Sequence, residues 1–125
     1  MAQESKDIKI VKKPWGEEQW LAHTDKYAGK ILIIEAGKRF SLQYHEVKHE
    51  TQYVVSGKIK MEIGPDGDHM EERILGPGAV TMVEPGTWHR IEAIETATIF
   101  EVSTPELDDV VRITDDFGRE GTNAP

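Results

Sequence analysis

The chain has 125 residues, a length typical of one domain with a single hydrophobic core. Its net charge of −8 argues against a general affinity for nucleic acid or anionic membranes, and the absence of cysteine excludes disulfides and thiolate metal sites. No apolar run approaches the ~20 residues that span a bilayer, so the composition predicts a globular domain. The first residues lack the apolar centre of a secretory signal, and a cytoplasmic location is the expectation.

Short runs that favour β-strands, separated by glycine and proline, make up most of the chain. Many short strands in a chain of this size predict an all-β sandwich or small barrel. Turns are expected at Ser56-Gly57 and over residues 64–68, where glycine, proline and aspartate supply special backbone angles. In chain order, the expected strands cover residues 17–23, 29–37, 40–45, 51–64, 79–86, 88–95 and 97–104.

One domain is expected to span residues 1–125. Its barrel core should cover about residues 13–113, after an N-terminal arm at residues 1–12. The hydrophobic pattern is lost near the end of the chain, which predicts a tail over about residues 115–125.

The expected strand at residues 40–45 carries two candidate metal ligands. Side chains alternate along a strand, so Gln43 and His45 point to the same side. A turn separates them from Glu50, which converges on them if it faces inward; Glu46 or His49 could replace it if the turn is built differently. For a lone glutamine the simpler interpretation is an exposed amide, but the spacing to the histidine and glutamate favours a ligand.

A fourth donor is expected from a later strand. His89 shares its strand face with Ile91 and Ala93, and a histidine flanked by apolar residues is a candidate inward ligand. The candidate metal ligands are therefore Gln43, His45, Glu50 and His89. Two imidazoles, one carboxylate and one amide suit Zn, Mn, Co, Ni or Fe(II).

The segment from Gly37 to Gly57 resembles the first cupin motif, with glutamine where many cupins have histidine, and the segment from Gly78 to His89 resembles the second. Four blocks resemble the cupin domain of type II mannose-6-phosphate isomerases, where it is often fused to a sugar-nucleotide pyrophosphorylase. These blocks cover residues 13–20, 37–61, 85–93 and 102–119. The resemblance implies a single-domain cupin jelly-roll, a double-stranded β-helix barrel with a divalent metal inside. Zinc is the first expectation.

The same resemblance implies aldose–ketose isomerisation of a phosphorylated sugar. The metal would polarise the sugar oxygens, and a base would move a proton between C1 and C2. His49 and Lys48 are candidate bases, and Arg39, Arg112 and Lys48 are candidate phosphate contacts. Two alternatives stay open: a cupin that binds a different small molecule with or without catalysis, and a metal-dependent dioxygenase, which Gln43 disfavours.

The sequence departs from the family pattern at several positions. The family's HHHRSEHW is HEVKHETQ here, so that Lys48 replaces an arginine and Thr51-Gln52 replaces a histidine–tryptophan pair. Glu84 replaces the usual proline of the second motif, and Ala93 replaces an asparagine. These changes leave the four candidate ligands intact and put the identity of the substrate in question.

The expected partner is a small-molecule substrate, a phosphorylated sugar, with neither nucleic acid nor membrane. We also expect a homodimer, because the segment IKIVKK at residues 8–13 could add to a partner's sheet edge.

Overall fold

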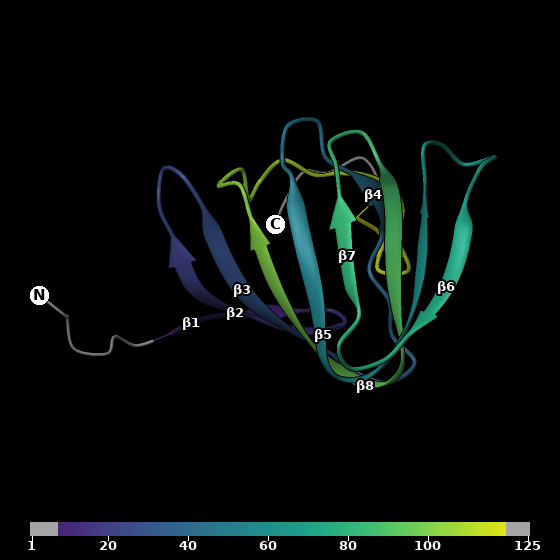
Figure 1. The fold of residues 1–125 in the computed structure, drawn as a ribbon, viewed down its shortest axis with the longest axis horizontal. Helices are drawn as coiled ribbons and strands as arrows, with labels where there is room; N and C mark the ends of the chain where they lie inside the picture. The colour runs from purple at the N-terminus through teal and green to yellow at the C-terminus, as the bar shows by residue number, and fades with distance from the viewer. Residues whose placement is uncertain (1–7, 120–125) are drawn as a thin grey trace, which may run out of the picture.

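The computed structural model describes residues 8–119, which contain β-strands and turns and no helix. The all-β fold predicted from the strand pattern is confirmed (Figure 1). The strands are β1 (Lys9–Lys13), β2 (Gly16–His23), β3 (Ala28–Ile34), β4 (Leu42–Tyr44), β5 (Glu50–Gly64), β6 (Glu71–Leu75), β7 (Val80–Val83), β8 (Trp88–Ser103) and β9 (Val111–Thr114).

The strands form one antiparallel sheet that curls on itself into an open barrel (Figure 1). The long strands β5 and β8 pair along most of their length and belong to both halves of the sheet. In the first half the strand order is β1-β2-β3-β8-β5-β7, and in the second it is β9-β4-β8-β5-β6. The space between the halves holds both the core and the candidate site, which share Trp15, Leu32 and Phe40.

Strand β5 bends where it passes from one half to the other. Its register with β8 shifts between Val54 and Ile59. Gly57 lies in this stretch with φ of 85°, and a Cβ there would lie 2.3 Å from the carbonyl oxygen of Thr96. The expected turn at Ser56-Gly57 is therefore a bulge within a continuous strand, because glycine allows the bend without reversing the chain.

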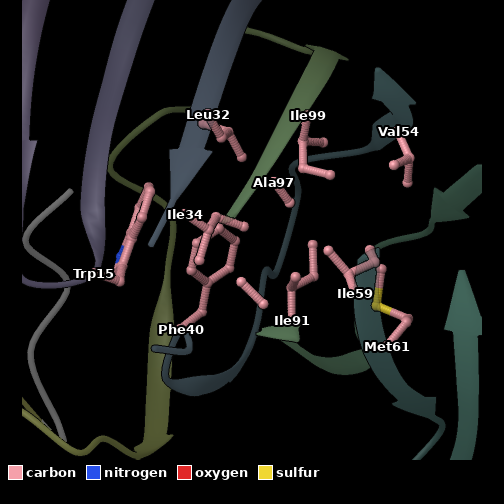
Figure 2. Close-up of a cluster of buried hydrophobic side chains, with 11 residues drawn as sticks. Trp15, Leu32, Ile34, Phe40, Val54, Ile59, Met61, Ile91, Ala97 and Ile99 are labelled. Carbon is pink, nitrogen blue, oxygen red and sulfur yellow. The ribbon is translucent and has the colours of Figure 1, made fainter. Parts of the chain in front are cut away.

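The core is a cluster of buried apolar side chains between the two halves (Figure 2). Alternation along each strand sends every second side chain inward, so Leu32 and Ile34 of β3 face Ile91 of β8 and its neighbours. Trp15 packs on Phe40 with ring centroids 4.3 Å apart. The remaining members of the cluster are Val54, Ile59, Met61, Ala93, Ala97 and Ile99.

Three strands lie outside the segments expected from the sequence, namely β1, β6 and β9. Strand β1, part of the expected N-terminal arm, pairs with β2 of its own chain. Residues 1–7 of the arm and 120–125 of the tail lie outside the described residues. No helix of the described part is long and apolar enough to cross a membrane.

Candidate metal centre

Three of the candidate ligands meet between the two halves of the sheet. His45 follows β4, Glu50 begins β5 and His89 lies near the start of β8. The Oε1 atom of Glu50 lies 3.4 Å from Nε2 of His45 and 3.2 Å from Nε2 of His89. One ligand atom from each residue lies within 4.8 Å of the others, and all three side chains are buried.

Backbone carbonyls orient both imidazole rings. The Nδ1 of His45 lies 2.6 Å from the carbonyl oxygen of Asp109, and the Nδ1 of His89 lies 2.9 Å from that of Thr87. Because a carbonyl oxygen only accepts hydrogen bonds, each Nδ1 carries the proton, and Nε2 of the neutral ring is left with a bare lone pair. Within the described residues, neither Nε2 has a hydrogen-bond partner.

This arrangement suits a cation. The Nε2 atoms of both rings lie within 3.4 Å of a carboxylate oxygen, and three buried acceptors repel one another unless a positive charge lies among them. Imidazole nitrogen and carboxylate oxygen are ligands of Zn²⁺ and the other first-row divalent ions. The residues present therefore fit the divalent metal that the sequence predicts.

Gln43 lies beside this triad. It is opposite His89 in the register of β4 with β8, opposite Arg112 in the register with β9, and it lines the same cavity. Its Oε1 accepts a hydrogen bond of 2.7 Å from the hydroxyl of Ser41. An amide oxygen has two lone pairs, so one is left for a further interaction. Its role as a fourth ligand stays a prediction.

Lys48 contacts the metal triad through Glu50. Its Nζ lies 3.0 Å from Oε2 of Glu50 and 3.4 Å from Oε2 of Glu101. Burial alone would lower the pKa of Lys48, but the carboxylates of Glu101 and Glu50 outweigh it and raise that pKa above its usual value. Burial likewise opposes ionisation of Glu50, yet the charge of Lys48 holds the pKa of this carboxyl well below its usual range. A protonated ammonium cannot accept a proton, so this position favours a cationic role over a basic one.

The other predicted functional residues divide between the cavity and the surface. Arg112 is buried and lines the cavity. His49 is exposed, and Arg39 binds Asp116 through Nε and Nη2 at 2.8 and 2.9 Å. Neither His49 nor Arg39 is among the residues that line the cavity.

A row of polar side chains crosses the inner face of the sheet beside the triad. Gln52, Glu101, Lys30 and Trp20 are successive cross-strand neighbours on β5, β8, β3 and β2, and we call them the polar row. Gln52 donates a hydrogen bond of 3.0 Å to Glu101, while Nζ of Lys30 lies 3.0 Å from Glu18 and 3.8 Å from Glu101.

The sequence motifs do not include the polar row, although a signal for it exists. Lys30 shares its strand face with Leu32 and Ile34, and Glu101 shares its face with Ile99. Burying a charge costs free energy unless it is paired. A charged residue in phase with core residues on a strand therefore indicates either a buried ion pair or a binding site.

The cavity has a volume of about 60 Å³ and opens to solvent. The triad lines it, together with Lys13 and Arg112. The side chain of Lys13 is only 4% exposed, and its Nζ lies 3.8 Å from Glu18. Burial lowers the pKa of both Lys13 and Arg112. Apolar side chains complete the wall: Trp15, Leu32, Phe40, Leu107 and Val110.

Comparison with known proteins agrees with this architecture. Mannose-1-phosphate guanylyltransferase of Escherichia coli (strain K12) is 31% identical over 114 residues, which are 87% of this chain and 23% of that protein. KdgF from Halomonas sp. superimposes with a TM-score of 0.69 at 25% identity, over 82% of this chain and 91% of that one. Oxalate decarboxylase OxdC of Bacillus subtilis shares the fold, with a TM-score of 0.72 at 21% identity, over 84% of this chain and 30% of that one.

The curated relatives are much longer than the region they share with this chain, which spans 23% of their length. The family model described as a cupin domain matches residues 30–103, which include His45, Glu50 and His89. That match covers more than half of the sequence and all of β4 to β8. The chain belongs to the cupin family.

Proposed function

We propose that this cupin is a sugar-phosphate isomerase that interconverts an aldose and a ketose. The observation that carries the proposal is the buried His45–Glu50–His89 triad in one cavity with the cations Lys13 and Arg112. One relative is named a mannose-1-phosphate guanylyltransferase, which supports a phosphorylated hexose as ligand. Since the chain spans only part of that protein, its own activity has to be tested directly.

The triad, with Gln43 as fourth ligand, would hold the metal, and we propose zinc. When bound, a divalent ion supplies a Lewis acid that polarises the oxygens of an α-hydroxy carbonyl compound. Glu50 is held ionised by Lys48, and the two Nδ1 hydrogen bonds keep both Nε2 atoms turned toward it.

Glu101 is the carboxyl group that we propose moves the proton. It lines the cavity, and burial, followed by the negative charge of Glu50, raises its pKa. A raised pKa makes the carboxylate a stronger base and brings its pKa closer to neutral pH, where one group can serve both as base and as acid. Lys48 and Lys30 lie at 3.4 and 3.8 Å from it and compensate its charge when it is ionised.

For the phosphate group we propose Lys13 and Arg112. Both line the cavity, and Arg112 is one strand away from Gln43. Arg39 lies outside the cavity, and the ammonium of Lys48 is placed between Glu50 and Glu101. A volume of about 60 Å³ holds only a few water-sized groups, so a hexose phosphate would extend into the open mouth.

The test is elemental analysis followed by turnover of mannose 6-phosphate with the best metal restored. Near one metal per chain in the wild type, lost on His45→Ala and His89→Ala, together with turnover, would support the isomerase. His69→Ala is the matched control, because His69 is exposed and pairs with Asp66. A stoichiometric metal without turnover would refute the isomerase and leave the metal centre standing.

One observation favours a second candidate, a cupin whose ligand differs from that of the isomerases it resembles. Lys48 and Gln52 both stand where the family motif has another residue, and both contact Glu101. If this part of the cavity wall contacts a different ligand, we expect residues that differ from the family motif to lie together there, as these two do around Glu101. Binding of a sugar phosphate without turnover would favour this candidate, and oxygen uptake with Fe(II) would indicate a dioxygenase.

We also propose a homodimer formed through an outer face of the sheet. Ile31, Phe100, Tyr53 and Val80 are successive neighbours across β3, β8, β5 and β7. Met82 and Val102 lie beside this row, and both are opposite Thr51 in the register of β5 with its neighbours. Of these six apolar residues, all except Ile31 are exposed. We call these six apolar residues the outer apolar patch.

The size of the outer apolar patch fits a second copy. Half-exposed large side chains present roughly 50–100 Å² each, so the five exposed members supply on the order of 250–500 Å² of apolar area. A standard interface buries about 800 Å² per partner, of which somewhat more than half is apolar. The patch contains no charged residue, and a two-fold dimer can pack it against itself.

A further inference from the structure

The turn between β4 and β5 sets the relative position of two of the three proposed metal ligands. His45 stands at its start, and Glu50 begins the strand after it. Residues 46–49 are not part of a strand, so sheet hydrogen bonds do not hold them in place. Contacts from elsewhere must therefore set the separation of the two ligands.

Asp109 supplies three of these contacts through its carboxylate. Oδ1 accepts the N–H of Glu46 at 3.1 Å, and Oδ2 accepts those of Val47 at 2.7 Å and Lys48 at 2.9 Å. Although burial opposes it, these three hydrogen bonds lower the pKa of Asp109, so the carboxylate that binds the turn is ionised.

The backbone of Asp109 contacts the first ligand. Its carbonyl oxygen accepts the Nδ1–H of His45 at 2.6 Å, which sets the tautomer and the rotation of the ring. Asp109 therefore binds the ligand ring with its carbonyl and the ligand-bearing turn with its carboxylate. The two contacts join segments that are 64 residues apart in the sequence.

We propose that Asp109 is a positioning residue for the metal centre, which holds His45 and the following turn so that Nε2 faces Glu50. Neither of its contacts reaches the metal directly. The carboxylate holds the backbone of residues 46–48, and the carbonyl oxygen holds the His45 ring. Outer contacts of this kind are worth about 10- to 100-fold in metal affinity. The inference rests on the proposed metal centre and not on the isomerase reaction.

A purely structural role makes a different prediction. If Asp109 only stabilises the turn, its loss lowers the unfolding temperature and leaves the metal affinity of the folded protein unchanged. If it positions His45, the folded protein binds metal more weakly, and the spectrum of a bound ion changes. The two roles separate when affinity and stability are measured on the same protein.

The experiment compares Asp109→Asn and Asp109→Ala with Asp108→Asn in the full chain. Asp108 is the exposed neighbour, so its variant removes the same charge one residue away. Metal is removed with a chelator, and the affinity for Zn²⁺ is measured by competition with a chromophoric chelator. The visible absorption of the Co²⁺-loaded protein reports the geometry at the ion, and circular dichroism checks the fold.

We expect a graded loss of Zn²⁺ affinity, with Asp109→Ala weaker than wild type by about 10- to 100-fold and Asp109→Asn between the two, since the amide keeps one acceptor oxygen. The Co²⁺ spectrum should change in the Asp109 variants and stay unchanged in Asp108→Asn. If Asp109→Ala does not fold, the Zn²⁺ affinity and Co²⁺ spectrum of Asp109→Asn still distinguish a positioning role from a purely structural one.

Equal Zn²⁺ affinity in folded Asp109→Asn, Asp108→Asn and wild type would overturn the positioning role. If the wild type binds no metal, the metal centre and this inference both fall. Tight binding in the wild type without isomerase activity refutes only the proposed reaction.

Discussion

Lys48 and Glu50 lie two residues apart in the chain and form an ion pair inside the barrel, with Nζ 3.0 Å from Oε2. The other carboxylate oxygen, Oε1, faces both histidines of the triad. Glu50 therefore has one oxygen beside the lysine and one beside the two histidines. The charge of the lysine keeps this candidate ligand ionised.

The stability of the metal-free protein should depend on pH through Glu50. Its pKa is held well below 4.5, the value for an unperturbed glutamate. An acid with a lower pKa in the folded state contributes stability at pH values above its unfolded pKa, and this contribution is lost as the pH falls through the folded pKa. We expect the free energy of unfolding to fall below about pH 4.5. Glu50→Gln should flatten that part of the profile.

Urea denaturation of the chelator-treated protein, from neutral to acid pH, measures this effect. Glu46→Gln is the control, because Glu46 is exposed. Parallel profiles for Glu50→Gln and the wild type would mean that Glu50 titrates normally in the fold.

Removal of the proposed proton carrier should separate turnover from metal binding. We expect Glu101→Gln to lower kcat for mannose 6-phosphate by about 10²- to 10⁴-fold, the usual contribution of a general acid–base group. The metal content should stay near that of the wild type, since Glu101 is not one of the three clustered ligands. Steady-state kinetics on the zinc-loaded protein give the measurement.

The control for this variant is Glu95→Gln, which changes an exposed carboxylate of the same strand, opposite Lys58 in the middle of the β5–β8 pair. If Glu101→Gln retains the wild-type kcat, then another group moves the proton. If it loses metal as well as turnover, Glu101 supports the metal site and its catalytic role is not isolated.

The local part of the site is predictable from the sequence because strand alternation is local. It places Gln43 with His45, and it places His89 with Ile91 and Ala93, which are both fully buried. The resemblance of residues 37–57 and 78–89 to the two cupin motifs then links the four candidate ligands to one site. The all-β fold follows from the same alternation and from the turn residues between the runs.

The rest of the site depends on contacts between distant segments. Lys30 faces Glu101 only through the register of β3 with β8, and Asp109 reaches His45 across 64 residues. The residues close in sequence to Lys30 and to Asp109 do not indicate which distant residue each will contact. The same holds for Gly57, where a local turn signal cannot distinguish a chain reversal from a bulge in a long strand.

The bend of β5 should depend on Gly57. An alanine Cβ there would lie 2.3 Å from the carbonyl oxygen of Thr96, at a φ of 85° that disfavours any side chain. We expect Gly57→Ala to lower the free energy of unfolding by about 2–4 kcal/mol, through backbone strain and the displaced strand. Thermal and urea denaturation provide the measurement.

Gly76→Ala is the matched control, because no atom lies within 4 Å of a Cβ at Gly76. We expect it to be neutral or stabilising by up to about 1 kcal/mol, through the reduced entropy of the unfolded chain. Equal stability of the two variants would mean that β5 tolerates a side chain at the bend.

The outer apolar patch should control the oligomeric state. Tyr53 and Phe100 are direct cross-strand neighbours at its centre, and both are exposed in a single chain. A charge placed there would be buried between two copies without a partner, which costs several kcal/mol at each of two symmetry-related positions. We expect Tyr53→Asp and Phe100→Asp to be monomers where the wild type is a dimer.

Ile94→Asp, an exposed position on the other half of β8, should remain a dimer. Sedimentation equilibrium of the three variants and the wild type measures the mass. A monomeric wild type would refute the dimer, and dimeric Tyr53→Asp and Phe100→Asp would move the interface to another face.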